Sequence, residues 1–318
     1  MKKNLIATTV CAAAVTSSVL AGPAPVDSEK TIIDPPAAGF DAARRPISNP
    51  TLFDLAIPRT NVHPIYMYQT MPSRIALAGG GTLPLGGDFS VYALQFEYAL
   101  NDRFSIIATK DGYIDFNPDN TLNEDDGFAD LAAGVKYAFI LDPVQQLAVS
   151  GSLVVETYSG DSSVWQGNGE GAVNLSVAAL KLANQWQFAG ALGVHLPFDE
   201  DEESVTGFMS AHVGYNITDR LYALAEVNWH HVISEGNGTA TFGPQLGSTV
   251  PTIAGFEGGD LINLGTANPV KDIVTAAIGV RYRLCDSADL GLAYEIPLTD
   301  EEENLMESRI TVDLVVTF

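Results

Sequence analysis

Apolar and polar residues alternate with a period of two through most of the chain after residue 61. This period is typical of β-strands that have one apolar and one polar face. The pattern predicts twelve strands, at about 62–72, 88–100, 103–116, 128–141, 146–159, 170–183, 185–198, 205–218, 220–233, 271–285, 288–298 and 305–318. No apolar run in this region reaches the roughly 18 residues that a transmembrane helix needs, so a helical membrane protein is excluded.

The connections between these segments alternate in length. Five are tight, with the sequences NDR, DPVQQ, ANQ, TDR and CDSAD, and the connections between them are longer. Short turns at one end and long loops at the other are typical of a transmembrane β-barrel. We therefore expect an all-β fold, an antiparallel up-and-down transmembrane barrel of about 12 strands over residues 62–318.

The two faces of the predicted strands differ as a membrane barrel requires. In segment 185–198, Trp186, Phe188 and Leu192 lie on one face, whereas Gln187 and His195 lie on the other. One face suits lipid and the other suits water. A soluble β-sandwich also alternates, but it buries its apolar face, and the asymmetry of the loops favours the membrane barrel.

The composition agrees with a membrane protein. Hydrophobic residues make up 46% of the chain and charged residues 17%, and the mean hydropathy is +0.12 although the net charge is −23. Apolar and charged residues are therefore segregated rather than mixed. A nucleic-acid partner is excluded, because a phosphate backbone is bound through clustered Lys and Arg.

The first 21 residues predict a secretory signal peptide. Lys2 and Lys3 precede an apolar stretch, and small residues lead up to Ala21, which is the layout of a cleaved signal. Residues 22–61 are rich in Pro and Ala without a sustained period, so we expect an extended periplasmic segment there. The apolar stretch TLFDLAI within it leaves a second interpretation open, a short plug or docking element under the barrel.

The polar face of the strands places charged side chains of both signs inside the barrel. These candidate lumen residues are Glu97, Asp130, Lys136, Glu156, His195, His212, Glu226, His230, Arg281, Arg283, Glu295, Arg309 and Asp313. They form either an ion-pair network that braces the wall or a polar path for a solute. Many inward positions are small, among them Gly134 and Ala191. Since a twelve-stranded barrel can be filled or open, we expect a narrow pore.

Neither a metal nor a cofactor is expected. The three inward histidines lie on separate strands and lack the spacing of a metal motif. The acidic runs at 199–203 and 300–303 lack the ligand spacing of a calcium loop, and they predict a rim that attracts cations or contacts lipopolysaccharide through divalent ions. The loop 234–270 is the longest, and we expect it to constrict the lumen because loops of that length are usually functional.

A lipid-acting enzyme is the main alternative to a channel, because outer-membrane phospholipase A is also a twelve-stranded barrel, with Ser, His and Asn on its outer wall. His231 lies beside Trp229 on the lipid face near the rim. An ionisable side chain there costs free energy, so it is a candidate for a functional role. A catalytic histidine needs a nucleophile within reach, and neither Ser210 nor Ser234 suits that role. We therefore expect no enzymatic activity. A structural barrel without transport is a third alternative.

The chain ends on Phe318, on the apolar side of an alternating strand. This ending resembles the C-terminal signal of Gram-negative outer-membrane barrels, which the barrel-assembly machinery recognises, so Phe318 is the candidate assembly signal. The stretches GFADLAAGVKYAF (127–139) and VRYRLCDSADLGLAYEIPL (280–298) are similar to outer-membrane transporters linked to phenol-degradation meta pathways. The resemblance implies an outer-membrane channel or transporter for small organic solutes, hydrophobic or aromatic ones among them, whose partners are membrane lipid, lipopolysaccharide and the assembly machinery.

Overall fold

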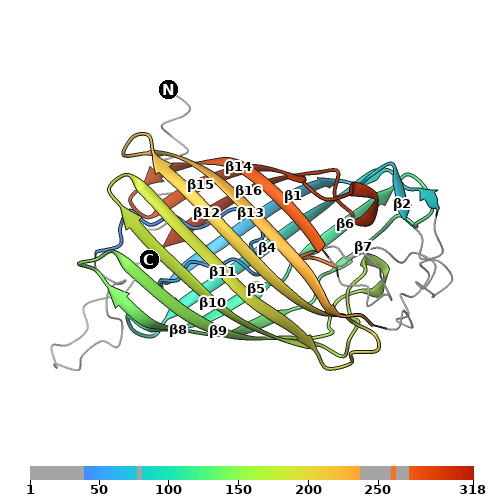
Figure 1. Cartoon of the computed structure of the whole chain (residues 1–318), viewed down its shortest axis with the longest axis horizontal. Coiled ribbons are helices and arrows are strands. Elements are labelled where there is room, and N and C mark those ends of the chain that lie inside the picture. The colour runs from blue at the N-terminus through green and yellow to red at the C-terminus, as the bar shows by residue number, and fades with distance from the viewer. Residues whose placement is uncertain (1–38, 77–80, 237–258, 263–271) are drawn as a thin grey trace, which may run out of the picture.

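The chain folds into a closed antiparallel β-barrel (Figure 1). The computed structural model describes residues 39–76, 81–236, 259–262 and 272–318. The barrel strands are β1 (Asn61–Thr70), β4 (Gly87–Ala99), β5 (Phe104–Lys110), β8 (Ala132–Asp142), β9 (Leu147–Glu156), β10 (Ala172–Ala183), β11 (Trp186–Pro197), β12 (Val205–Asn216), β13 (Leu221–Ser234), β14 (Asp272–Cys285), β15 (Ala288–Pro297) and β16 (Ser308–Thr317). β1 pairs with both β4 and β16, so the first and last strands seal the sheet. Closure leaves no unpaired strand edge for a bilayer to satisfy.

The twelve strands predicted from the alternation are confirmed, but two of them are interrupted. The segment 103–116 divides into β5 and β6 (Tyr113–Pro118), and β7 (Asp125–Phe128) precedes β8. Gly112 causes the first break, because its φ of 134° is a conformation that other residues rarely adopt. Beside it, Asp111 Oδ1 accepts a hydrogen bond from the Leu94 amide at 2.8 Å, which replaces a bond of the sheet. Within the described residues, no helix is long and apolar enough to cross a membrane.

The two ends of the barrel differ. The five tight turns lie at the end that holds Phe318, on the left of Figure 1, which is the periplasmic end by the usual asymmetry of outer-membrane barrels. The extracellular end carries the hairpin of β2 (Arg74–Ala76) and β3 (Thr82–Pro84), together with β6, β7 and the short 3-10 helices η1 (Ser162–Val164) and η3 (Glu301–Glu303). Most of the predicted constricting loop 234–270 lies outside the described residues.

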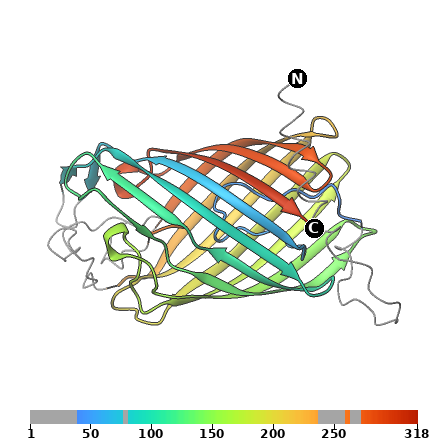
Figure 2. The same cartoon turned by 180° about the vertical axis from the view of Figure 1, so that it is seen from behind.

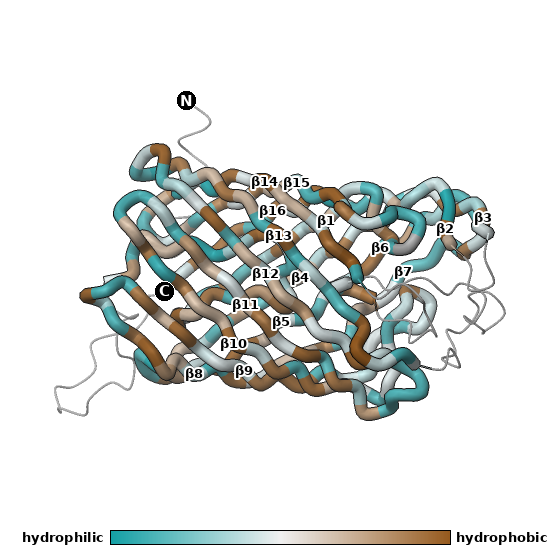
Figure 3. Tube along the Cα trace, in the orientation of Figure 1, coloured by the Kyte–Doolittle hydropathy of each residue, from teal (hydrophilic) through white to brown (hydrophobic). Residues whose placement is uncertain are grey.

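Large apolar side chains cover the outside of the wall, and Figure 3 shows the alternation of hydrophobic and hydrophilic positions along the strands. On β4, Tyr92, Leu94 and Phe96 are 54%, 50% and 49% exposed, whereas Gln95 and Glu97 on the other face are 2% and 3% exposed. An exposed apolar band around a closed barrel is a lipid-facing surface. The barrel therefore belongs in the outer membrane of a Gram-negative bacterium.

Residues 39–60, which we call the plug, lie inside the barrel (Figure 2). The expectation of an extended periplasmic segment is therefore corrected for this part of the chain. Phe40, Phe53 and Ile57 are almost completely buried and pack in one cluster with inward residues of the wall, such as Ala178 and Ala191. The small inward residues leave room in the lumen, and the plug buries its apolar side chains by filling that room.

Candidate functional site: the plugged lumen

The structure places all thirteen candidate lumen residues on the inner side of the barrel. Eleven of them are buried, and the side chains of His195 and Arg283 are 12% and 26% exposed. Asp130 lies just before β8 rather than in a strand. The residues do not converge on one point, because some bind the plug and others pair with one another near the extracellular loops.

The side-chain amide of Gln187, on β11, binds the backbone of the plug. The Arg44 amide donates to Gln187 Oε1 at 2.8 Å, and Gln187 Nε2 donates to the Arg44 carbonyl at 2.7 Å. Gln95 of β4 donates from Nε2 to the Pro50 carbonyl at 3.0 Å. These contacts satisfy backbone groups of a segment that has no regular secondary structure, as burial requires.

Glu226 of β13 holds the middle of the plug. Its carboxylate accepts hydrogen bonds from the Ile47 amide at 3.1 Å, the Ser48 amide at 2.7 Å and the Ser48 hydroxyl at 2.5 Å. The ring of His212 lies against the same carboxylate, with Nδ1 2.7 Å from Oε1, and its Nε2 is 2.6 Å from the Tyr222 hydroxyl. A buried carboxylate with this many donors is an anchor for the plug.

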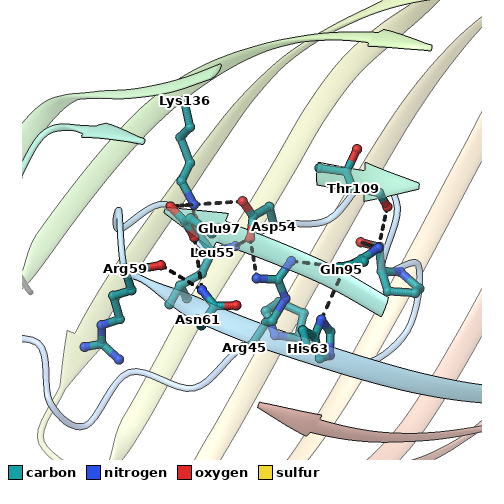
Figure 4. A network of polar contacts seen from close by, with 12 residues as sticks. Arg45, Asp54, Leu55, Arg59, Asn61, His63, Gln95, Glu97, Thr109 and Lys136 are labelled. Carbon is teal, nitrogen blue, oxygen red and sulfur yellow. Dashed lines mark hydrogen bonds and ion pairs between the residues drawn. The ribbon is translucent and has the colours of Figure 1, made fainter. Parts of the chain in front are cut away.

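Asp54 ties the plug to the opposite wall by ion pairs (Figure 4). Lys136 Nζ lies 2.7 Å from Asp54 Oδ2 and 2.8 Å from Glu97 Oε1, and it also donates to the Leu55 carbonyl at 2.9 Å. Arg45 Nη1 lies 3.0 Å from Asp54 Oδ1. Burial alone would raise the pKa of Asp54, but the charges of Arg45 and Lys136 hold that pKa at about 2. The carboxylate is therefore ionised at neutral pH.

A second buried network lies at the seam where the barrel closes. His63 of β1 has its Nε2 2.7 Å from Asp313 Oδ2 of β16 and its Nδ1 3.2 Å from Gln95 Oε1 (Figure 4 shows the His63–Gln95 contact). Arg281 Nη2 of β14 lies 2.8 Å from the same Asp313 oxygen. This network joins the first and last strands with β4 and β14, so it supports closure of the wall.

Except for Arg283, which lies at the periplasmic end of β14, the remaining charged residues gather near the extracellular loops. Lys110 pairs with Glu156, and His195 Nε2 lies 3.0 Å from Glu203 Oε1. A cavity of about 40 Å³ beside them has room for only a few water molecules. Across the lumen, Arg309 donates two hydrogen bonds to the carboxylate of Asp260, at 3.0 and 3.2 Å. The described residues make this part of the lumen charged and leave a small cavity in it.

Apolar side chains also face the lumen in its extracellular half. They come from β1, β2, β4, β6, η1 and the loops, and we call this group the apolar cluster: Ile65, Met67, Met71, Ile75, Leu85, Phe89, Val91, Ile114, Phe116, Leu122, Ala129, Val164, Trp165, Leu261, Ile262 and Leu305. Phe116 lies between two aromatic neighbours, with ring centroids 5.9 Å from Phe89 and 6.5 Å from Trp165. A small cavity of about 10 Å³ lies between this cluster and the plug residues Pro50 and Thr51.

Sequence reasoning missed several residues of the site. Arg44, Arg45 and Asp54 were not candidates because the plug has no periodicity that marks a buried face. Lys110 would point outward by simple alternation along β5, but a shift of register between Ala108 and Lys110 turns it toward Glu156. Alternation did place Gln187 on the inner face, and no signal in the sequence marked it as a contact of the plug.

For the enzymatic alternative, the described residues provide a histidine–carboxylate pair on the outer rim but no nucleophile beside it. His231 Nδ1 lies 2.9 Å from Asp272 Oδ1 on the outer rim, and Trp229 Nε1 donates to the same oxygen at 2.7 Å. Among the described residues, no hydroxyl group makes a hydrogen bond to His231, and no cluster of three or more His, Cys, Asp or Glu residues could hold a metal ion. We interpret His231 and Asp272 as a structural ion pair at the rim, to which Trp229 of the interfacial belt donates a hydrogen bond.

A solved outer-membrane channel has a similar fold. An outer membrane channel from Pseudomonas putida F1 matches with a TM-score of 0.59 at 14% identity, over 82% of this chain and 96% of that chain. The NanC porin matches with a TM-score of 0.49 at 9% identity, over 81% of this chain and 100% of that chain. No family model and no curated protein matches the sequence. At these identities the likeness shows the outer-membrane barrel fold alone.

Proposed function

We propose that the protein is an outer-membrane channel for small organic solutes with apolar surface, and that the plug holds it closed. The observation that carries this proposal is the apolar cluster. A pore for hydrophilic solutes has a polar interior, whereas here Met67, Phe89 and Phe116 face inward and are buried in the extracellular half of the lumen. The similarity in fold to a channel from Pseudomonas putida F1 supports transport over catalysis.

Passage through the barrel requires the plug to move. Both ends of the plug lie at the periplasmic mouth, because Gln146 of a tight turn donates to the Gly39 carbonyl and Phe318 donates from its amide to the Thr60 carbonyl. The plug is thus a loop that reaches into the lumen and returns. Hydrogen bonds and ion pairs hold it there, and the loop can withdraw toward the periplasm without opening the wall.

Uptake of radiolabelled toluene by porin-deficient cells that express the full chain tests the proposal. Val91→Asn inserts a polar group into the apolar cluster and should lower uptake severalfold, because an apolar solute would have to bury next to an unsatisfied amide. Ser152→Asn is the matched control, since Ser152 faces the polar part of the lumen and bonds to Ser176 at 2.5 Å. Uptake no faster with the protein than without it would contradict the proposal, and phospholipid hydrolysis by the purified chain would favour the enzyme.

A further inference from the structure

Four arginines gather at the periplasmic end of the lumen, and we call them the arginine cluster. Arg44 and Arg59 belong to the plug, and Arg281 and Arg283 face inward from β14. The four charges are close enough to influence one another. Burial has the largest effect on the pKa of Arg44, and the other three arginines add to it, so that this pKa falls to about 10 although Asp289 opposes the change.

Several guanidinium groups of this cluster have buried N–H donors without an acceptor. The side chain of Arg281 is 1% exposed, yet its Nε and Nη1 make no hydrogen bond to any described residue. The Nε atoms of Arg59 and Arg283 likewise make none. Asp289 lies between two of the arginines, but its oxygens are 3.7 Å from Arg44 Nε and 3.8 Å from Arg283 Nε, which is too far for a hydrogen bond. Buried charged donors of this kind indicate a site that suits an anionic acceptor.

Both wall arginines donate hydrogen bonds to backbone carbonyls of the plug. Arg281 Nη2 donates to the Pro46 carbonyl at 3.4 Å, and Arg283 Nη2 donates to the Asp41 carbonyl at 3.1 Å. Gly291 of β15 keeps space for Asp313 and Arg281, since a Cβ atom there would overlap Asp313 Oδ1 and lie 3.1 Å from Arg281 Cζ. Arg281 Nη2 also pairs with the Asp313 carboxylate at 2.8 Å, so the neutral carbonyl of Pro46 is a weaker, second acceptor for the same nitrogen.

We propose that the arginine cluster binds the carboxylate of a transported solute, so that the substrates are aromatic or aliphatic monocarboxylates. This inference rests on the proposed function, because the same solute would cross the apolar cluster in the extracellular half before it meets the arginines at the periplasmic end. A carboxylate offers two oxygens in the plane of a guanidinium fork. Asp289 and Asp313 already face the cluster, so a singly charged group suits the remaining donors better than a doubly charged phosphate. In replacing the carbonyls of Pro46 and Asp41, the carboxylate also loosens the plug.

Calorimetric titration of the full chain in detergent tests this inference with three probes: benzoate, benzyl alcohol and inorganic phosphate. Arg283→Gln should weaken benzoate binding about tenfold and leave benzyl alcohol binding unchanged, because it removes a charged donor and no apolar surface. Arg281→Lys keeps the positive charge but removes the two parallel N–H donors of the guanidinium, so it should also weaken benzoate binding. Arg220→Gln is the matched control, since Arg220 is exposed in a periplasmic turn outside the lumen. A shift in gel migration between unheated and boiled samples would verify that each variant is a closed barrel.

The outcomes separate this inference from the proposed function. Benzoate binding that is no tighter than benzyl alcohol binding, or that neither arginine variant weakens, would overturn the carboxylate site while leaving the channel in place. Phosphate that displaces benzoate at equal concentration would also overturn it, because the cluster would then be a general anion site. If the chain binds neither aromatic probe and cells gain no toluene uptake, the proposed function fails together with the inference.

Discussion

Replacing Asp54 by Asn tests whether ion pairs hold the plug in the lumen. The change removes a carboxylate that lies 3.0 Å from Arg45 Nη1 and 2.7 Å from Lys136 Nζ. Asparagine keeps the size of the side chain and an oxygen that can accept the hydrogen bond from the Leu55 amide. Lys136 retains its partner Glu97, but Arg45 is left with one side-chain contact, a hydrogen bond of 3.3 Å to a glutamine of β4.

The free energy with which Asp54 holds the plug in place can be bounded in two ways. Removing one partner of a buried ion pair typically costs about 3–5 kcal/mol. The pKa of Asp54 gives a lower figure, because the difference between its ordinary 3.8 and its value of about 2 corresponds to roughly 2–3 kcal/mol of stabilisation of the charged form. Even this lower figure multiplies the ratio of displaced to seated plug by some tens-fold, on the order of 30 or more.

Planar-bilayer recordings of the full chain measure that ratio as the fraction of time in a conducting state. We expect brief, rare openings in the wild type and a much larger open fraction in Asp54→Asn. Asp41→Asn is the matched control, because the Asp41 side chain is exposed and its backbone carbonyl makes the contact with Arg283. The reasoning is refuted if Asp54→Asn conducts like the wild type, or if Asp41→Asn opens the barrel equally.

Three further predictions concern the pH dependence of the plug, the packing of the wall and assembly of the barrel. The difference in open fraction between wild type and Asp54→Asn should be constant above about pH 4 and vanish toward pH 2, because a depressed pKa stabilises the folded state only above that range; a difference that persists at pH 2 would contradict this. Gly214→Ala should lower stability in urea by about 1–3 kcal/mol, since its Cβ would overlap a tyrosine of β13, whereas Gly151→Ala meets only ordinary contacts and should be neutral. Deleting Phe318 should lower the yield of heat-modifiable barrel in the outer membrane more than Thr317→Ala, because Phe318 lies on the exterior at the end of the sealing strand and is 55% exposed; equal yields would remove its role as an assembly signal.

The sequence predicts the wall of the barrel better than its contents. Alternation places Lys136 and Glu226 inside, because successive side chains of a strand point to opposite faces. A residue on the inner face of a closed barrel is then buried in the lumen. The break at Gly112 could not be foreseen, since a glycine inside an alternating run does not reveal its φ. Asp289 was assigned to a tight turn by its sequence CDSAD, although it starts the inner face of β15 beside Arg283.

The plug could not be predicted for a different reason. Its position depends on the wall residues that receive it, such as Gln187 and Glu226, which lie more than 140 and 170 positions further along the chain. A segment without regular structure carries no period that reports its burial. The apolar TLFDLAI stretch was the one indication of a plug, and a cluster of apolar residues cannot distinguish a lumen from a docking surface.

The return of the plug to its own starting end has a mechanical consequence. Gly39 sits at the periplasmic mouth, and the contacts that hold the loop follow one another inward, first Arg44 on Gln187 and then Ile47 and Ser48 on Glu226. A force that pulls the chain toward the periplasm at Gly39 loads these contacts one after another, as in unzipping, rather than all at once, as in shear. The work of withdrawal is the same by either route, but the peak force is set by a single contact.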